Sequence, residues 1–327
     1  MSAASSRKLT CATPSLLTKT ERNSMTSLNG YTAFITGGGS GLGRAFAKAA
    51  CKRNINVILA DIQADSLNQT VEELRSLGGK VSSITVDVAD AAAMHRCSDE
   101  VHRLHGPVHL VFNNAGVTSS GPVWESTDKD WDWLLGVNLK GVINGIRSFV
   151  PQMLANAKRD PSYRGKVVNT ASMAGLITAP GMGIYSVSKH AVVALSECLH
   201  HDLQLATTQV EVAVLCPSYV PTAIGNSERN RPTHLANDAP PTKLQLASRE
   251  AAQQAVSQGG ISADAVAEIT FQAIEDGRFY IFPSPETLVA VKPRFAHILD
   301  QSNPQLPYEL FPALKDRRDK MLKSMNQ

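Results

Sequence analysis

The octapeptide TGGGSGLG at residues 36–43 decides how the rest of the chain is interpreted. It lies between a run typical of a strand, TAFIT (32–36), and a segment typical of a helix, GRAFAKAACKRN (43–54). Gly37, Gly41 and Gly43 permit a tight turn and a close approach of a pyrophosphate to the backbone. The amino terminus of the next helix would present free N–H groups and a positive dipole end to the phosphates. A glycine cluster alone can be a plain turn, but this context favours a dinucleotide loop.

Strand-like and helix-like segments continue to alternate along the chain. Apolar runs that predict further strands lie at 56–61, 81–88, 108–116, 165–172, 210–217 and 278–283. Helices are predicted over 64–79, which ends on Gly78 and Gly79 as a C-cap, and over 261–277. Each strand is apolar throughout, as expected when helices cover both faces of a sheet. The pattern predicts an α/β fold with a doubly wound parallel sheet.

We expect one folded domain over residues 27–284. Residues 1–26 are rich in Ser and Thr and nearly free of acids, which predicts a disordered extension, with a mitochondrial presequence as the alternative. A polar, Pro- and Asn-rich stretch predicts a substrate loop or lid over residues 223–260. Residues 285–327 are expected to form a C-terminal extension that is helical in pieces. The expected breaks are Pro293, Pro304, Pro307 and Pro312.

Composition excludes several classes of protein. The net charge is only +3 and no long basic run occurs, so no nucleic-acid surface is expected. No apolar run approaches the ~18 residues of a membrane span. The five cysteines are odd in number and form no C-x-x-C pair, which indicates free thiols in a reducing compartment, the cytoplasm. No metal site is predicted, because the nearest cluster lacks carboxylate or thiol partners. That cluster consists of His95, His102, His105 and His109.

Asp61 indicates which cofactor the glycine loop would take. It ends the second strand, 18 positions beyond Gly43, where a carboxylate would accept hydrogen bonds from the adenosine ribose hydroxyls. The same charge would repel a 2′-phosphate and Ile62 beside it carries no compensating charge, so NAD is predicted rather than NADP. The alternative is a helix N-cap. Asp87 would bind the adenine amino group or merely form a turn, and Arg44 would meet a phosphate or lie along its helix.

Taken together, the motifs resemble the short-chain dehydrogenase/reductase superfamily, in its non-extended branch. They are T-G-x-x-x-G-x-G at 36–43, NNAG at 113–116, GVNLKG at 136–141, VVNTASMAG at 167–175 and YSVSK at 185–189. The resemblance runs from about Ser27 to Thr222. It implies a single-domain, seven-stranded Rossmann-type sheet and NAD(P)-linked oxidation of alcohols or reduction of carbonyls. It also implies a homodimer or homotetramer with a small-molecule alcohol or carbonyl as substrate.

A narrower resemblance concerns the substrate. Residues 130–153 and 277–286 are similar to the Cα-dehydrogenases that oxidise benzylic alcohols in lignin β-aryl-ether breakdown. This similarity favours an aryl secondary alcohol or aryl ketone. An apolar substrate wall is also expected, from side chains close to the matching motifs. They are Val123, Met173, Leu176 and Met182.

The resemblance implies a catalytic role for four residues. Ser172 precedes Tyr185 by 13 positions, and Lys189 follows Tyr185 by one helical turn. A free tyrosine has a pKa near ~10, and a lysine ammonium and the positive nicotinamide ring would favour the phenolate. Tyr185 would then exchange the substrate proton while Ser172 stabilises charge on the substrate oxygen. Lys189 would also bind the ribose of the nicotinamide half. Asn138 would hold a water that links Lys189 to solvent.

Further cofactor contacts are implied by the matching positions. They are Ser40, Leu42, Val88, Asn113, Asn114, Ala115, Gly116, Val220 and Thr222. The chain departs from the family at PSYVPT (217–222), where Ser218 replaces a glycine and leaves the backbone path open. Each assigned side chain could instead be structural, so the alternative function is a catalytically silent, cofactor-binding regulatory protein. Dehydration or epimerisation on the same fold is disfavoured by the short glycine motif.

Overall fold

The structure is a computed structural model that describes residues 27–285 and 288–306 together with Lys315, Asp319 and Lys323. The extension expected over residues 1–26, and the breaks expected at Pro307 and Pro312, lie outside the described residues.

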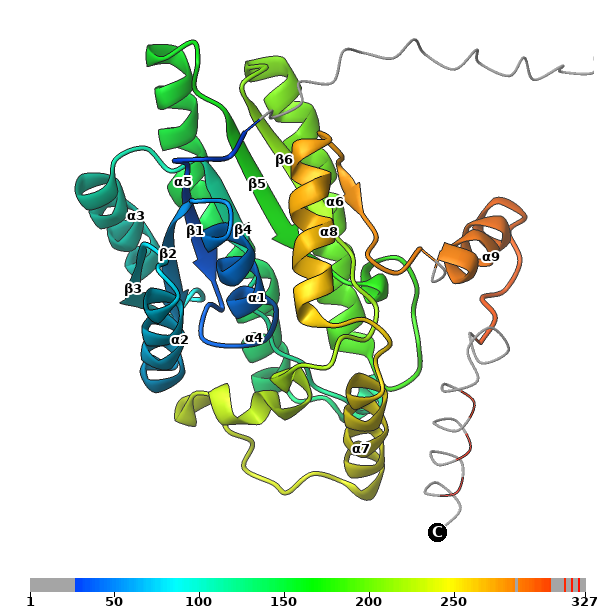
Figure 1. Ribbon diagram of the computed structural model, residues 1–327. Coiled ribbons are helices and arrows are strands. Elements are labelled where there is room, and N and C mark those ends of the chain that lie inside the picture. Colours follow the sequence, from blue (N-terminus) through cyan, green and yellow to red (C-terminus); the bar gives the residue numbers. More distant parts are fainter. Residues whose placement is uncertain (1–26, 286–287, 307–314, 316–318, 320–322, 324–327) are drawn as a thin grey trace, which may run out of the picture.

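Seven parallel strands form one sheet in the order β3-β2-β1-β4-β5-β6-β7 (Figure 1). Their bounds are β1 Thr32–Thr36, β2 Asn56–Asp61, β3 Val81–Thr85, β4 Leu110–Asn113, β5 Gly165–Thr170, β6 Val210–Leu215 and β7 Tyr280–Ile281. β1 and β2 have the predicted bounds, and the other strands are shorter than the apolar runs. The strand order reverses between β1 and β4. In doubly wound sheets, ligands bind at the carboxyl ends of the strands beside this reversal.

Helices cover both faces of the sheet, as the continuously apolar strands predict. Their bounds are α1 Gly41–Cys51, α2 Ala64–Ser76, α3 Ala91–His105, α4 Asp128–Leu135, α5 Gly141–Arg159, α6 Gly183–Ala206, α7 Lys243–Ser257, α8 Ala263–Glu275 and α9 Leu288–Leu299. α1, α2 and α8 pack on one face, and α3, α5 and α6 on the other. The α/β, Rossmann-type fold is confirmed. No helix in the described part of the chain is both long and apolar enough to cross a membrane.

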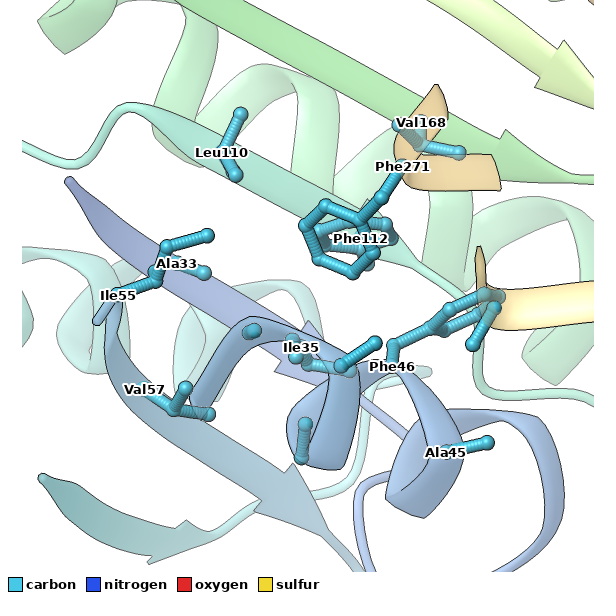
Figure 2. Close-up of a cluster of buried hydrophobic side chains, with 14 of the residues drawn as sticks. Ala33, Ile35, Ala45, Phe46, Ile55, Val57, Leu110, Phe112, Val168 and Phe271 are labelled. Atoms are coloured by element: carbon cyan, nitrogen blue, oxygen red, sulfur yellow. The ribbon is translucent and has the colours of Figure 1, made fainter. Parts of the chain in front are cut away.

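Aromatic side chains join the layers on the face that carries the glycine loop. Figure 2 shows Phe46 of α1, Phe112 of β4 and Phe271 of α8 in one buried cluster. The ring centroids of Phe46 and Phe112 are 5.0 Å apart, and those of Phe112 and Phe271 are 5.6 Å apart. All three side chains are fully buried, so α1 is held on the sheet by packing over its whole length. This packing gives the loop before α1 a rigid support.

Residues 223–260, predicted to be a substrate loop or lid, contain a regular helix in their second half. The short 3₁₀ turns η4 (Ala223–Asn230) and η5 (Thr233–Leu235) come first, and the 15-residue helix α7 follows. Thr242 and Gln245 form a capping box at the start of α7: the Thr242 hydroxyl accepts from the Gln245 N–H (3.1 Å), and Gln245 Oε1 accepts from the Thr242 N–H (3.0 Å). The T-x-x-Q spacing is a helix-start signal that the Pro-rich composition obscured.

The break predicted at Pro293 is also wrong, because Pro293 lies inside α9. Proline removes one backbone donor from a helix, yet its fixed φ remains compatible with helical geometry. Pro304, by contrast, follows the end of α9 in irregular backbone. Between residues 288 and 306 the C-terminal extension is therefore one helix followed by an irregular segment, and Figure 1 shows α9 standing to one side of the sheet and its covering helices.

Candidate active site

The glycine loop joins β1 to α1 and is shaped by close backbone contacts. Gly37 and Gly41 have φ values of 68° and 51°, in the left-handed region that favours glycine. A Cβ at Gly43 would overlap the carbonyl oxygen of Gly37, so α1 can lie this close to the loop only with glycine there. Ser40 is the N-cap of α1 but makes no side-chain capping bond. The free N–H groups of the first turn can therefore bind an anion, as the sequence predicts.

Asp61 ends β2 and faces this loop. Its Oδ2 accepts a hydrogen bond from the Gly39 N–H (2.9 Å), and its Oδ1 accepts from the Gln63 N–H (3.0 Å). The N-cap of α2 is Gln63, so the N-cap alternative for Asp61 is wrong. Arg44 forms an ion pair with Glu73 of α2, which places it along the helix surface.

A hydrogen-bond junction connects the carboxyl ends of β1, β4 and β5. The Thr36 hydroxyl accepts from the backbone N–H groups of Asn114 (2.9 Å) and Ala115 (3.0 Å), and it donates to the Phe112 carbonyl (3.2 Å). The Asn114 side chain donates to the Thr36 carbonyl (3.0 Å) and accepts from the Thr170 hydroxyl (3.3 Å). These bonds fix the three strand ends relative to one another.

Ser172, Tyr185 and Lys189 converge beyond this junction. Ser172 caps the short turn η3 (Met173–Gly175), accepts from the Ala174 N–H (3.1 Å) and donates to the Pro217 carbonyl at 3.5 Å. Tyr185 and Lys189 are buried on α6. Lys189 Nζ donates to the Thr170 carbonyl (2.8 Å) and lies 5.8 Å from the centroid of the Tyr185 ring. The predicted serine, tyrosine and lysine thus form one cluster.

Burial shifts the pKa of both titratable members of this cluster. It raises the pKa of Tyr185 to about 12, while the hydrogen bond with Ser172 acts in the opposite direction. It lowers the pKa of Lys189 to about 8, against a smaller opposing effect of Cys216. Burial favours the neutral form of each group. Burial by itself therefore opposes the expected phenolate, which needs a positive charge close to Tyr185, such as a Lys189 ammonium.

Asn138 lies behind the cluster in a π-helical turn, η2 (Gly136–Lys140), that connects α4 to α5. Its side chain accepts from the Val117 N–H (2.8 Å) and donates to the Val117 carbonyl (2.9 Å) and to the Ser188 hydroxyl (3.1 Å). A Cβ at Gly116 would lie 3.4 Å from Asn138 Oδ1 and 3.6 Å from Lys189 Nζ, so Gly116 lies between the two side chains. Such π-helical turns are frequent at functional sites.

A single cavity of about 450 Å³ connects the glycine loop with this cluster. The predicted residues that line it are Gly37, Ser40, Gly41, Leu42, Asp61, Asp87, Val88, Asn114, Ala115, Gly116, Ser172, Tyr185, Lys189, Val220 and Thr222. Gly43 and Asn138 do not line the cavity. They contact residues that do, Gly37 and Val117. The expectation for Asn113 is wrong, because its side chain is buried and donates to Asn169 Oδ1 (2.9 Å). Asp87 Oδ1 accepts from the Ala89 N–H (2.9 Å), which is the predicted turn.

The far end of the cavity has apolar walls, only some of which the sequence predicted. Met173 and Met182 line it as expected, whereas Leu176 packs into the core and Val123 is exposed to solvent. Sequence reasoning missed the other apolar lining residues. They include Trp133, Ile177, Tyr219, Ile224, Leu235 and Val256. Three of these lie in the segment 223–257. The prediction that this segment is a substrate lid could have indicated that its apolar side chains line the cavity.

Ser218 follows an ordinary backbone path although it replaces the family's glycine. Outside glycine, positive φ values in the described residues occur only at Asn54 and Gln301. Ser218 therefore needs no left-handed backbone, and it lines the cavity as part of the loop that leads to Thr222. The Thr222 side chain lies against the glycine loop, 3.2 Å from where a Cβ on Gly41 would be. This contact joins the start of the segment 223–257 to the glycine loop.

His109, one of the four clustered histidines, makes packing and backbone contacts. His109 stacks between the rings of Tyr31 and Tyr163, at 4.4 and 5.2 Å, and its Nδ1 accepts from the Thr32 N–H (3.1 Å). Within the described ranges, no group of three or more His, Cys, Asp or Glu side chains is placed to hold a metal ion.

Comparisons with a family model, with other protein sequences and with solved structures all indicate the same family. A family model described as short chain dehydrogenase matches residues 31–233. C alpha-dehydrogenase from Sphingobium sp. strain SYK-6 is 33% identical over 273 residues, which cover 83% of this chain and 86% of that protein. A CLA biosynthesis dehydrogenase/reductase from Lactiplantibacillus plantarum is 29% identical over 276 residues, covering 84% and 94% of the two chains.

Among solved structures, a short chain dehydrogenase/reductase from Burkholderia phymatum in complex with NAD is similar in sequence and in fold. It is 44% identical with a TM-score of 0.84, and the match covers 86% of this chain and 99% of that one.

The overlap at Gly43 generates a test of the glycine loop. We expect Gly43→Ala to lower the free energy of unfolding by about 1–3 kcal/mol, because the new methyl group must displace the Gly37 carbonyl. Urea denaturation of the full chain measures this change. The matched control is Gly260→Ala: a Cβ there meets nothing within 4 Å, so stability should be unchanged or rise by up to about 1 kcal/mol. Equal effects at the two glycines would contradict the packing argument.

Proposed function

The chain belongs to the short chain dehydrogenase family, and from this premise we propose that it is an NAD-dependent oxidoreductase for a secondary alcohol or its ketone. One observation carries the proposal. Ser172, Tyr185 and Lys189 lie on the wall of the same cavity that the glycine loop and Asp61 line at its other end. A dinucleotide held by that loop would reach the cluster with its nicotinamide. When bound, NAD supplies the hydride acceptor or, in its reduced form, the donor.

We assign the cofactor contacts residue by residue. The N–H groups at the start of α1 would bind the pyrophosphate, and Asp61 would accept hydrogen bonds from the adenosine ribose. Ala115 and Gly116 would border the nicotinamide half, where Lys189 would bind the second ribose. NAD is favoured over NADP because Asp61 is an anion, and because the nearby cation Arg44 is already paired with Glu73. The NAD complex of the Burkholderia relative supports this preference.

Tyr185 is proposed as the acid–base group. In oxidation its phenolate would accept the hydroxyl proton, and in reduction its phenol would return a proton to the carbonyl oxygen. The Ser172 hydroxyl would hydrogen-bond the substrate oxygen as charge develops there. Its existing bond to the Pro217 carbonyl is long, 3.5 Å, so little is lost when the hydroxyl turns to the substrate.

Lys189 and Asn138 are proposed to support Tyr185. The Thr170 carbonyl holds the Lys189 ammonium near the Tyr185 ring, where its charge favours the phenolate. Asn138 holds the backbone of Val117 and thereby the strand-end loop beside Lys189. We also propose that Asn138 holds a water that links Lys189 to solvent.

The substrate is proposed to have an aryl or otherwise apolar body. Trp133, Met173, Met182 and Leu235 surround the far end of the cavity, and burial of apolar surface against them would favour such a molecule. The similarity to C alpha-dehydrogenase from Sphingobium supports this proposal. A homodimer or homotetramer and a cytoplasmic location also remain proposals, the second supported by free thiols at Cys51, Cys97, Cys198 and Cys216.

A panel of aryl, steroid and aliphatic secondary alcohols, assayed with NAD⁺ by NADH absorbance, tests the proposal directly. We expect turnover of at least one apolar alcohol. A purified protein that binds NADH but turns over no member of the panel, in either direction, would favour a catalytically silent regulatory protein instead.

Tyr185→Phe tests the proposed acid–base group. The change removes the phenolic hydroxyl and keeps the ring that packs on α6. We expect kcat to fall by about a thousandfold or more, since a positioned proton-transfer group typically contributes 10²–10⁴-fold. NADH binding, followed by its fluorescence, should change by less than about twofold. Near-normal turnover in this variant would overturn the assigned mechanism.

Asp61→Ala tests the choice of cofactor. Loss of the carboxylate should weaken NADH binding by about tenfold, because a charge-assisted hydrogen bond to the ribose is lost. Binding of NADPH should improve relative to NADH, because repulsion of the 2′-phosphate is removed. Dissociation constants measured for both cofactors give the ratio. A wild-type protein that prefers NADPH would show that Asp61 has been misinterpreted.

The shifted pKa values predict the pH dependence of the reaction. Below about pH 8 both Lys189 and Tyr185 carry their protons, so no base is available for oxidation. Once the pair has lost one proton, the remaining proton can reside on Lys189 and leave Tyr185 as phenolate. We expect kcat/KM for alcohol oxidation to rise about tenfold per pH unit up to about pH 8 and then level off. A flat profile between about pH 6 and about pH 10 would contradict this assignment.

A further inference from the structure

The segment that closes the far end of the cavity, residues 223–257, is bonded to α4 and to the turn before it. Its side chains reach three acceptors or donors there: Asn237 lies 2.7 Å from the Thr127 hydroxyl, Asp238 2.9 Å from Lys129 Nζ, and Thr242 2.6 Å from Glu125. These three contacts are exposed, so each contributes little. A fourth contact, between Arg231 and Asp130, differs from them in its burial.

Arg231 and Asp130 form an ion pair with an N–O distance of 2.8 Å, and their side chains are only 6% and 8% exposed. The Lys129–Asp238 pair, which joins the same two segments, is 36% and 91% exposed. A buried pair is not weakened by water and salt as a surface pair is. Loss of Arg231 would leave the buried Asp130 carboxylate without its cation, which costs far more than loss of the exposed pair. Loss of Asp130 would cost less, because Glu228 also lies 3.6 Å from the Arg231 guanidinium.

Both members of the buried pair have further hydrogen bonds. Asp130 accepts from the Thr127 N–H (3.0 Å) and from Asn237 Nδ2 (3.0 Å), while Arg231 Nε donates to the Leu235 carbonyl (2.7 Å). Burial alone would raise the pKa of the Asp130 carboxyl, but the bonds from Thr127, Arg231 and Asn237 hold it below its ordinary value. The carboxylate therefore stays charged at neutral pH, and the pair fixes the backbone turn of residues 231–235 on α4.

Arg231 also contacts an aromatic side chain of the cavity wall. Its guanidinium carbon lies 5.0 Å from the centroid of the Trp133 ring, within the range of a cation–π contact. Trp133 is 1% exposed and packs with Ile184 and Tyr185 in one cluster. The indole Nε1 of Trp133 has no hydrogen-bond partner in the described part of the chain. Packing, including the guanidinium on its face, therefore holds this ring in place.

We propose that Arg231 is a positioning residue, which through Asp130 and Trp133 fixes the apolar wall of the substrate cavity beside Tyr185. Neither Arg231 nor Asp130 lines the cavity, whereas Trp133 and Leu235 do. Arg231 thus acts through its neighbours. Its effect on turnover rests on the proposed oxidoreductase function, but its effect on the mobility of residues 223–235 does not.

Hydrogen exchange on the full-length chain tests the mechanical part of the proposal. We expect Arg231→Gln to raise the exchange rate of backbone amides in residues 223–235 by about tenfold or more, because the buried Asp130 charge is left unpaired. Asp130→Asn should raise the same rates by a smaller factor, because Arg231 keeps Glu228 as a partner. The control Lys129→Ala removes the exposed pair between the same segments and should leave these rates within about twofold. In the double variant the increase should be smaller than the sum of the two single effects, in free-energy units.

Steady-state kinetics with 1-phenylethanol as the probe and NAD⁺ test the positioning role. We expect Arg231→Gln to raise KM by about tenfold or more and to change kcat by less than about threefold, since the wall binds substrate and the proton-transfer groups are intact. Arg231→Lys keeps the charge but loses the planar stack on Trp133 and should give an intermediate KM. The dissociation constant of NADH should change by less than about twofold.

Several outcomes would overturn the proposal. Equal exchange rates in Arg231→Gln and Lys129→Ala would show that the buried pair does not hold the segment, as would a raised KM without faster exchange. Equal losses of kcat and kcat/KM would show a general structural defect. If Arg231→Gln does not fold, Arg231→Lys against Lys129→Ala gives the same comparison. A wild-type chain that turns over no alcohol would end the proposed function, while the exchange comparison would still decide the role of the pair.

Discussion

The hydroxyl of Thr36 is the contact on which the site depends. It accepts hydrogen bonds from the N–H groups of Asn114 and Ala115, at 2.9 and 3.0 Å, at the point where the sheet reverses its order. Thr36 directly precedes the glycine loop, and Asn114 in turn accepts a bond from the Thr170 hydroxyl. The Thr170 carbonyl then holds Lys189. A chain of hydrogen bonds of 2.8 to 3.3 Å therefore places the glycine loop, the strand-end loop and the proposed catalytic lysine in one fixed arrangement.

Burial then determines the electrostatics of that arrangement. Tyr185 and Lys189 are both buried, and burial favours a neutral phenol and lowers the pKa of the lysine to about 8. Each group needs a nearby charge of the opposite sign to ionise, and together they can supply it to one another. The proposed nicotinamide ring would add positive charge at the same place. Burial also strengthens the proposed positioning role of the Arg231–Asp130 pair, because its side chains are only 6% and 8% exposed and solvent screens them little.

The lid segment shows where prediction from sequence was incomplete. Its composition indicated a mobile loop, yet residues 243–257 form a capped helix, and residues 231–235 are held on α4 by a buried pair. The T-x-x-Q cap at Thr242 was visible in the sequence, so α7 could have been predicted from local chemistry. The partnership of Arg231 with Asp130 could not, because the two residues are distant in the chain and many other charges were available to each. The same reason explains why Asn113, in a motif next to the cofactor, has Asn169 as its partner instead.

By itself, the sequence determined the alternation of strands and helices, the glycine loop and the one-turn spacing of Tyr185 and Lys189, because these are local patterns of one or two helical turns or one strand. The role of Ser172, 13 positions before Tyr185, was implied by the family resemblance. The strand-end position of Asp61 belongs to the same class of local information. Only the tertiary structure decided that Gly43 packs on Gly37, that Asn138 lies behind the cavity and that the lid supplies an apolar wall. These features depend on which distant side chains become buried together, and burial is a property of the whole fold and not of any segment.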